Sequence, residues 1–345
     1  MRILVTGAGG FIGSFIVERG LAEGHQMWAG IRASSSRTYL QNPQIHFTEL
    51  DLAHPEVLRP QLAACKADFG GWDIIVHAAG ATKCIRREDF FRTNTEGTRH
   101  FIDILRELNM VPRRFIFISS LSVFGAIREH PTRKATPDNP WIYAPIKNDD
   151  TPAPNTAYGE SKLEAERYIK SLSNFPYVIL RPTGVYGPRE KDYFVMAQSI
   201  KKHVDFSVGY HPQEITFVYV KDLVQAVFAA MVKDVERREF FISDGSVYHS
   251  TAFSNLIRKE LGHPFLLRIK APVWFLRIVC HANGYIGSLR GCATTLNRDK
   301  FHILRQRNWQ CDITPAEKEL DYRPEYPLER GVKETISWYK KEGWL

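Results

Sequence analysis

The 345-residue sequence contains only five cysteines, and they are widely scattered: Cys65, Cys84, Cys280, Cys292 and Cys311. Their number is odd, and none stands in a CxxC pair or near histidines at the spacing of a metal site. The cysteine pattern therefore disfavours both a disulfide framework and a metal centre, and we predict no metal in the functional site.

Long apolar runs are also missing. The nearest candidate, 265–282, is interrupted by Arg268, Lys270, Pro272 and Arg277, so no run of 18 apolar residues is available to span a bilayer. The first residues, MRILVTGAGGFIGSF, lack the charged region, apolar stretch and cleavage site of a signal peptide. We therefore expect a cytoplasmic protein.

The overall composition is that of an ordinary globular protein, with 44% hydrophobic and 24% charged residues. This excludes disordered, collagenous and coiled-coil chains. The formal charge of +8 at pH 7 favours anionic partners such as phosphates, although an ordinary solvated surface explains it equally well. Because the basic residues form no stripe, we expect no nucleic-acid partner.

Short apolar segments alternate with helix-length segments through the first 120 residues. Strands are predicted at Arg2–Thr6, Gln26–Arg32, Gln44–Leu50, Asp73–Ala78 and Arg114–Ser119, with helices at Phe11–Glu23, Pro55–Ala67 and Asn94–Leu108. Such alternation predicts an α/β fold with a Rossmann-type doubly wound parallel sheet.

A smaller, mostly C-terminal α/β lobe is expected to hold the substrate. We place the dinucleotide-binding domain at 1–185 plus about 215–245, and the substrate lobe at 186–214 and 246–345. Further helices are predicted at Phe194–Lys202, Val220–Lys233, Ser250–Leu261 and Leu328–Lys341.

Residues 126–157 interrupt this pattern, because six prolines leave no room for a helix or a central strand. A loop of this length in a compact domain is usually functional or disordered. We favour a lid or wall of the site over a plain surface insertion.

Three glycines, Gly7, Gly10 and Gly13, directly follow the first strand and open the first helix. A turn without Cβ atoms lets backbone N–H groups, including those of Phe11 and Ile12, meet a pyrophosphate at the helix N-terminus. The arrangement predicts dinucleotide binding.

The second strand indicates which dinucleotide. NAD-binding versions carry an acidic residue about 20 residues beyond the glycines, whereas this chain has Ile31 followed by Arg32. Arg32, Ser35 and Arg37 offer the cations and hydroxyl suited to a 2′-phosphate. We predict NADP(H); the alternative is NAD(H), with Arg32 stacked on the adenine. Asp51 is a candidate acceptor for the adenine amino group, although an Asp in a turn needs no ligand to explain it.

Tyr158 and Lys162 are four residues apart, which puts the phenol and the ammonium on one face of a helix. A free tyrosine titrates near about 10, so the charge of Lys162 and of an oxidised nicotinamide is needed to favour the phenolate. Ser119, Ser120 and Ser122 stand at the carboxyl end of a predicted strand, where α/β sheets place ligands.

With these motifs in hand, the chain resembles the extended short-chain dehydrogenase/reductase family, the NAD(P)-dependent epimerase/dehydratase group. Nearly the whole chain matches, in the family's order: TGAGGFIG at 6–13, DL at 51–52, HAAG at 77–80, Asn94, SSLSVFG at 119–125, YGESK at 158–162, RPTGVYGPR at 181–189 and FVYVKDL at 217–223.

The resemblance implies roles for individual residues. Ser120 donates a hydrogen bond to the substrate oxygen, Tyr158 is the general acid/base, and Lys162 holds the nicotinamide ribose. Asn94 braces the active-site helix or, alternatively, caps a helix. The other implied cofactor contacts are Leu52, Ala78, Ala79, Gly80, Ser119, Pro182 and Val185, and the implied substrate contacts are Thr82, Ser122, Phe124, Tyr186 and Arg189. Many relatives pair through two helices, so a homodimer is expected.

The family's dehydratases carry an Asp-Glu pair directly after the catalytic hydroxyl, where this chain has Leu121 and Ser122, so dehydration is disfavoured. The apolar and basic stretch 263–279 resembles the branch of beta-hydroxysteroid dehydrogenases and dihydroflavonol reductases. It predicts a bulky hydrophobic substrate and a peripheral membrane contact through 265–280, with a core or dimer helix as the alternative.

The leading hypothesis is therefore an oxidoreductase that interconverts a ketone and a secondary alcohol on a sterol-like, flavonoid-like or long-chain keto-lipid substrate. A nucleotide-sugar epimerase or reductase is the second hypothesis. A non-catalytic cofactor-binding scaffold is the third, although the Ser/Tyr/Lys set is intact.

Overall fold

A seven-stranded parallel sheet forms the centre of the molecule. The computed structural model describes residues 1–137, 140–290 and 298–345, with the backbone alone for 284–290 and 298; Cys292 lies outside the described residues. The strand order is β11-β6-β5-β4-β1-β2-β3. The strands are β1 (Arg2–Thr6), β2 (Gln26–Ile31), β3 (His46–Glu49), β4 (Ile74–His77), β5 (Arg114–Ile118), β6 (Tyr177–Pro182) and β11 (Arg238–Ile242).

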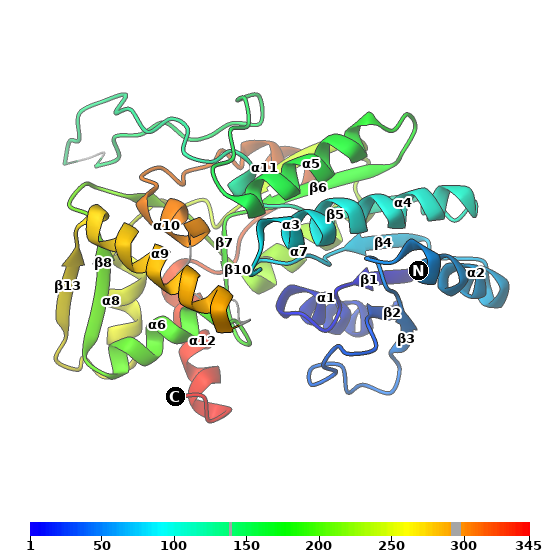
Figure 1. Ribbon diagram of the computed structural model, residues 1–345, viewed down its shortest axis with the longest axis horizontal. Coiled ribbons are helices and arrows are strands. Elements are labelled where there is room, and N and C mark those ends of the chain that lie inside the picture. Colours follow the sequence, from blue (N-terminus) through cyan, green and yellow to red (C-terminus); the bar gives the residue numbers. More distant parts are fainter. Residues whose placement is uncertain (138–139, 291–297) are drawn as a thin grey trace.

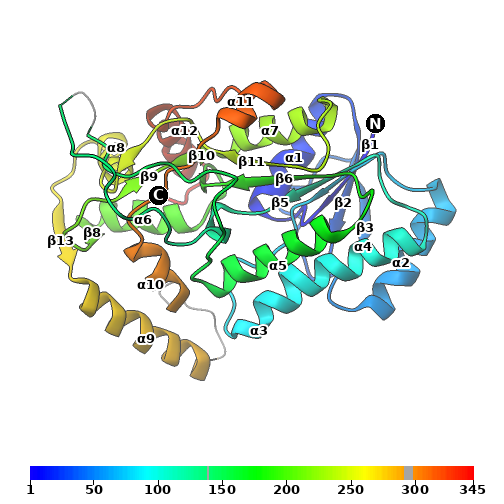
Figure 2. The ribbon, with the colours of Figure 1, turned by 90° about the horizontal axis from the view of Figure 1, so that it is seen from above.

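Helices cover both faces of this sheet (Figures 1 and 2). One face carries α1 (Phe11–Ala22) and α7 (Val220–Val232), and the other carries α2 (Pro55–Phe69), α4 (Gly97–Glu107) and α5 (Ala157–Ser171). The strands are buried on both sides because their successive side chains enter different cores: Ile3 packs toward α1, and Leu4 packs toward α2. The predicted doubly wound fold is confirmed.

The strand order reverses between β1 and β4. After β3 the chain crosses back to the other side of β1, so the loops following β1 and β4 separate at their carboxyl ends. Crevices of this kind are where open α/β sheets bind ligands. The glycine loop follows β1, the turn 78–80 follows β4, and Ser120 follows β5 at the same edge.

A second lobe is built mainly from the C-terminal part of the chain (Figure 1). Its core is aromatic: the rings of Tyr186, Phe217 and Phe253 are in mutual contact, and Tyr326 stacks on Tyr219. Its helices are α6 (Asp192–Lys201), α8 (Ala252–Glu260), α9 (Val273–Arg290), α10 (Arg298–Arg305) and α12 (Leu328–Lys341), and its strand pairs are β8 (Val204–Val208) with β13 (Leu267–Ala271) and β9 (Glu214–Ile215) with β12 (Tyr248–His249). The pair β7 (Gly184–Tyr186) and β10 (Phe217–Tyr219) leads into it, and α11 (Thr314–Leu320) packs on β11.

One predicted helix begins earlier than its sequence pattern indicated. The helix expected from Asn94 starts at α3 (Arg87–Phe90) and passes through a π-helical turn, η1 (Phe91–Glu96), before α4. A π-helical turn holds one more residue than an α-helical turn. In this one, Asn94 makes side-chain hydrogen bonds to Ala81 and Ser161, which lie outside its own helix. Asn94 is therefore inside a helix and does not cap one.

The segment 126–157 is tied to the second lobe at its base. The buried Glu214 carboxylate accepts hydrogen bonds from the backbone N–H groups of Ile142 (2.5 Å) and Tyr143 (3.1 Å). Ile146 forms a β-bridge with Cys311. Much of the described part of this segment before Ile142 projects from the molecule at the top of Figure 1.

Candidate active site

The glycine loop between β1 and α1 is closely packed against the turn after β4. Gly7 has φ of +68°, and a Cβ there would stand 2.7 Å from Ala79 Cα. A Cβ on Gly13 would stand 2.4 Å from the Gly7 carbonyl oxygen. Within the described part of the chain, no side chain caps α1 at Gly10, so the first backbone N–H groups of this helix are free to meet an anion.

A tight turn beyond β2 lies beside this loop. The Arg32 backbone N–H donates to Ser35 Oγ (3.1 Å), and the Ser35 N–H donates back to the Arg32 carbonyl (2.9 Å). A Cβ on Gly9 would stand 2.7 Å from the Ser36 carbonyl oxygen, so the turn touches the glycine loop. The Arg32 side chain is exposed, and the Arg37 guanidinium lies 4.3 Å from the centroid of the Phe47 ring.

Four of the remaining predicted cofactor contacts lie in a strand or in the segment that follows one. Asp51 accepts from the Ala53 backbone N–H (3.2 Å) and pairs with His54 (2.9 Å), so its carboxylate starts the turn into α2. Leu52 is half-buried against the core under α2. Pro182 ends β6, where it pairs with Ile242, and Val185 in β7 pairs with Val218.

A chain of hydrogen bonds joins the strands under the site. His77 Nδ1 lies 2.8 Å from Thr6 Oγ1, and its Nε2 lies 2.9 Å from Thr98 Oγ1. Burial lowers the pKa of His77 to about 3, helped by the charge of Lys162, so the ring is neutral. Thr98 donates to the Asn94 carbonyl, so His77 Nε2 carries the proton and Nδ1 accepts from Thr6, whose oxygen accepts from the Ala79 N–H.

We predict that His77→Leu destabilises the protein and weakens cofactor binding together. The substitution leaves the buried hydroxyls of Thr6 and Thr98 without this partner, at a cost of roughly 1–3 kcal/mol for each group. Thermal unfolding measures the first effect, and titration with nicotinamide dinucleotide measures the second. His25→Leu is the control, because the His25 imidazole takes no part in these hydrogen bonds. It should leave the affinity for cofactor unchanged.

Asn94 is completely buried, and its amide is used within the protein. Its Oδ1 accepts from the Ala81 N–H (2.7 Å), and its Nδ2 donates to the Ala81 carbonyl (3.1 Å) and to Ser161 Oγ (2.9 Å). Ser161 in turn donates to the Tyr158 carbonyl (2.8 Å). The structure thus corrects the expected cofactor contact: Asn94 braces α5 and the turn after β4.

The three predicted catalytic side chains come together at the carboxyl end of β5. Tyr158 and Lys162 lie on α5, which Thr156 caps by accepting from the Gly159 N–H (3.0 Å). Lys162 Nζ donates to the Ile118 carbonyl (2.8 Å), and a Cβ on Gly80 would stand 3.3 Å from Nζ. Ser120 follows β5, and its hydroxyl is hydrogen-bonded to the Tyr158 side chain.

The pKa values of Tyr158 and Lys162 both differ from those of the free side chains. Burial raises the pKa of the Tyr158 phenol to about 12, although the hydrogen bond with Ser120 acts in the opposite direction. Burial also lowers the pKa of Lys162 to about 8, against the opposing charge of Glu166. The phenol is therefore protonated at neutral pH and is a proton donor as it stands.

Ser119 points away from the crevice. It is buried, and its hydroxyl donates to Glu166, whose carboxylate forms a buried ion pair with Arg181 (2.6 Å). This placement does not support the predicted cofactor contact.

The predicted substrate residues fall into two groups. Thr82 is exposed, and Ser122 is half-buried with its hydroxyl 3.1 Å from that of Ser120, so both remain available beside the catalytic group. Phe124 and Tyr186 are completely covered by core side chains, so the structure offers neither of them to a substrate.

Arg189 is already engaged. Its guanidinium donates to Ser14 (2.9 Å) and Glu18 (2.5 Å) on α1 and lies between the rings of Phe15 and Tyr39. It lines a separate groove of about 530 Å³ between α1 and α12. Its side chain joins α1 to the second lobe, so a substrate contact would have to displace these bonds.

One residue outside the predicted site contacts Tyr158, and its neighbour in the sequence belongs to a cluster of charged residues. Asp299, on α10, accepts from the Tyr158 backbone N–H (3.3 Å). Asp192, at the start of α6, pairs with Lys83 and with Lys300 (3.4 Å), and although burial acts the other way, these two cations hold the pKa of Asp192 below its usual range. This cluster joins the two lobes, and no local pattern could predict it, because its members are far apart in the sequence.

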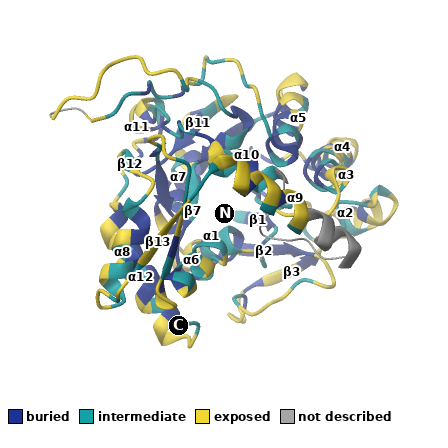
Figure 3. Cartoon of the chain, turned by 60° about the vertical axis from the view of Figure 1, so that its left-hand side comes forward, coloured by how far each residue is buried: buried dark blue, intermediate teal, exposed yellow. Residues whose placement is uncertain are grey.

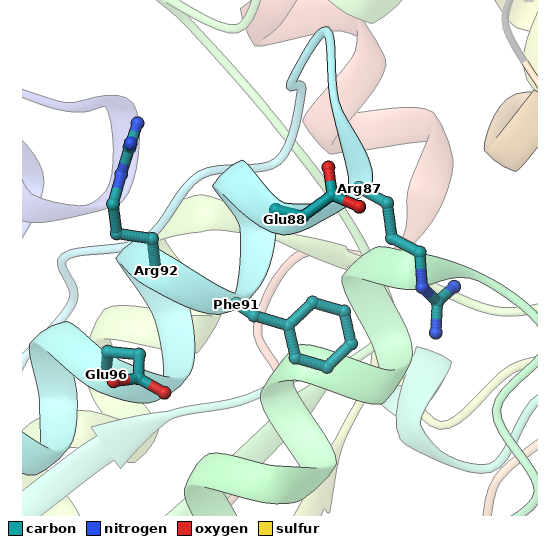
Figure 4. Close-up of a pocket in the computed structure, with 5 residues that line it drawn as sticks. All are labelled: Arg87, Glu88, Phe91, Arg92 and Glu96. Carbon is teal, nitrogen blue, oxygen red and sulfur yellow. The ribbon is translucent and has the colours of Figure 1, made fainter.

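A pocket of about 350 Å³ lies outside this constellation. It is lined by Arg87, Glu88, Phe91, Arg92 and Glu96, and none of these is a predicted site residue. Figure 4 shows the Phe91 ring facing α5, with Arg87 and Arg92 pointing to opposite sides. This pocket therefore contains none of the candidate catalytic residues.

The family model for the NAD dependent epimerase/dehydratase family matches residues 3–242, which include the glycine loop, Ser120, Tyr158 and Lys162. The chain belongs to this family. The predicted resemblance is confirmed, and the protein is an enzyme of the NAD-dependent dehydrogenase, epimerase and dehydratase type.

Individual relatives are distant. The chain is 25% identical over 275 residues to UDP-glucose 4-epimerase of Vibrio cholerae, covering 76% of this chain and 75% of that protein. It is 23% identical over 359 residues to the 3 beta-hydroxysteroid dehydrogenase/Delta 5-->4-isomerase of Mycobacterium tuberculosis, covering 98% and 90%. Among solved structures, UDP-glucose 4-epimerase from Thermotoga maritima superposes with a TM-score of 0.76 at 21% identity, covering 99% of both chains. The fold is thus shared with these structures.

Proposed function

We propose that this family member interconverts a ketone and a secondary alcohol on a bulky hydrophobic substrate of the sterol-like, flavonoid-like or long-chain keto-lipid class, using NADP(H) in preference to NAD(H). The observation that carries the proposal is the set Ser120, Tyr158 and Lys162 without an acid/base pair beside Ser120. Leu121, where dehydratases carry the first acid, is buried, and Ser122 is hydrogen-bonded to Ser120.

The crevice fits a nicotinamide dinucleotide. The close approach of Gly7 to Ala79 and the uncapped start of α1 leave room and donors for a pyrophosphate. Lys162, which lies beside the turn after β4, would hold the nicotinamide ribose. When bound, the cofactor supplies or accepts the hydride.

The protein's own residues then manage the proton. In the reducing direction, the neutral Tyr158 phenol donates its proton to the carbonyl oxygen, and Ser120 donates a hydrogen bond to the same oxygen. In the oxidising direction, Tyr158 must first lose its proton, and its raised pKa opposes this at neutral pH. The charges of Lys162 and of an oxidised nicotinamide would favour that loss, so the same residues can serve either direction.

The relatives support a hydrophobic substrate without deciding it. The match to the steroid dehydrogenase extends over nearly the whole chain, and so does a match to a sterol-4-alpha-carboxylate 3-dehydrogenase of Candida albicans, at 22% identity over 367 residues. The higher identity to the Vibrio cholerae epimerase covers a smaller share of the chain. A nucleotide-sugar epimerase or reductase is therefore kept as the second candidate, and a non-catalytic scaffold as the third.

The preference for NADP(H) rests on Arg32. We predict that Arg32→Ala raises the Kd for NADPH by about 10- to 150-fold, since a charge-assisted contact to the 2′-phosphate is worth roughly 1.5–3 kcal/mol, and leaves the Kd for NADH within a few-fold. Fluorescence titration with both cofactors measures the change. Arg59→Ala, an exposed arginine on α2, is the matched control. An unchanged NADPH/NADH preference would remove Arg32 from the cofactor site.

Mass spectrometry of the purified protein, native and then denatured, tests the proposal as a whole. Exchangeable NADP(H), followed by turnover of keto-sterols, flavonoid ketones or long-chain keto-lipids, is the expected result. Tightly retained NAD that does not exchange, with turnover of UDP- or GDP-sugars, would overturn it in favour of an epimerase.

A homodimer through α4 and α5, the helices side by side on one face of the sheet (Figure 2), is part of the proposal and is tested by sedimentation.

A further inference from the structure

The second lobe exposes a continuous apolar face around α9. On this helix, Trp274 is 66% exposed, Phe275 is 49% exposed and Ile278 is 58% exposed. Among the described side chains of α9, Leu276 and Cys280 are the buried ones, and they pack against Phe301 and Val208. Among the residues that the structure describes, none covers the outer side of α9, and Figure 3 shows this helix and β13 largely in the colour of exposed residues.

The neighbouring strand pair extends the same face. In the parallel register of β8 with β13, Phe206 lies beside Ile269, and Val204 lies beside Leu267. Val208, on the same side of β8 as Phe206, packs under α9, so this is the side of the sheet toward α9. Phe206 is nevertheless 62% exposed and Leu267 53% exposed, because α9 covers only the end of the pair.

The charge around this face has one sign. From Leu261 to Arg298 the sequence has no Asp or Glu and five Lys or Arg residues. Lys270 and Arg277 are exposed beside the apolar side chains, and Lys201 and Lys202 are exposed just before β8. The one acidic residue of β8, Asp205, is buried and paired with Arg268 (3.4 Å).

From these observations we infer that this face docks on the surface of a bilayer that contains anionic lipids. Aromatic and aliphatic side chains on one side of a helix, flanked by cations, enter the boundary between headgroups and acyl chains while the cations meet lipid phosphates. An uncovered apolar face of this extent is otherwise rare on a soluble monomer. Among the described residues, no helix is long and apolar enough to cross a membrane.

The position of the face gives the docking a use. The next described helix, α10, packs against α9 through Phe301 and Leu276. It also places Asp299 against the backbone of Tyr158 and Lys300 against Asp192. A substrate dissolved in the bilayer would therefore meet the protein at α9, and α10 connects this helix to the catalytic Tyr158. This use rests on the proposed function, whereas the docking itself does not.

Flotation with vesicles tests the docking without any substrate. The full-length protein is mixed at about 0.1 M salt with vesicles of phosphatidylcholine alone or with about 30% phosphatidylglycerol. We expect binding to the anionic vesicles and much weaker binding to the neutral ones, with a loss of at least about tenfold for Trp274→Asp or Ile278→Asp. Exchanging Lys270 and Arg277 for glutamine should weaken binding by about fivefold per charge.

Val232→Asp is the matched control, because Val232 is 69% exposed but lies on α7, away from this face. It should bind anionic vesicles like the unmodified protein, and circular dichroism should show that every variant is folded. Absence of binding to anionic vesicles overturns the inference. So does a change of oligomeric state in Trp274→Asp without vesicle binding, which would make the face a contact between copies. Vesicle binding without ketone turnover would leave the docking intact and remove only the proposed substrate class.

Discussion

Tyr158→Phe is expected to lower turnover by roughly 100- to 10,000-fold while leaving the Kd for the cofactor within a few-fold. The substitution removes only the phenolic oxygen, so α5, its cap at Thr156 and the placement of Lys162 should persist. Turnover is followed by absorbance of the reduced nicotinamide with the best ketone found. Cofactor binding is followed by fluorescence titration.

The same helix offers a matched control. Tyr168 lies ten residues further along α5, and its hydroxyl donates to Asp103 on the outside of the molecule. Tyr168→Phe should keep the turnover of the unmodified protein. If Tyr158→Phe also kept it, the acid/base assignment would be wrong, and the intact Ser/Tyr/Lys set would have to serve binding alone.

Arg181→Met is expected to be strongly destabilising. The Arg181 guanidinium makes two hydrogen bonds to Glu166, at 3.1 and 2.6 Å, and a third to Asn148 at 2.9 Å, and it is 2% exposed. Removing it leaves the Glu166 carboxylate buried without its cation, which costs roughly 3–5 kcal/mol. The melting temperature should fall by roughly 6–20 °C.

Two further variants separate the buried charge from simple loss of packing. R181M combined with E166Q removes both charges of the pair and should recover part of the lost stability, since the Glu166 carboxylate is then no longer buried without its cation. Arg238→Met breaks an exposed pair with Glu319 on the same sheet edge and should cost less than about 1 kcal/mol. Equal losses for Arg181→Met and Arg238→Met would contradict the argument.

The parts of the site set by short-range sequence patterns were predictable. The glycine loop is one, because Gly10 and Gly13 both approach the carbonyl oxygen of Gly7, which lies only a few residues away in the sequence. The Tyr158–Lys162 pair is another, because a spacing of four on a helix fixes a shared face. The parallel sheet followed from the same local alternation of strands and helices.

The parts set by contacts between distant segments were not predictable. The π-helical turn depends on Asn94 reaching Ala81 and Ser161, and the sequence around Asn94 carries no mark of it. Tyr186 and Phe124 stand in motifs that suggested substrate contact, yet the packing of the second lobe and of β11 buries them. A motif places a residue near a site, but only tertiary packing decides which way its side chain turns.

The position of β11 at one edge of the main sheet bears on how the chain is made. Its partner β6 ends at Pro182, but β11 begins only at Arg238, after the segment that forms α6, β8 and α7. At about 5–20 residues per second, the ribosome needs roughly 3–11 s to add the residues between them, and during that time the edge of β6 has no neighbour on that side. The nascent protein therefore completes its cofactor-binding sheet only after part of the second lobe has been synthesised, and a chaperone that shields open strand edges would act during that interval.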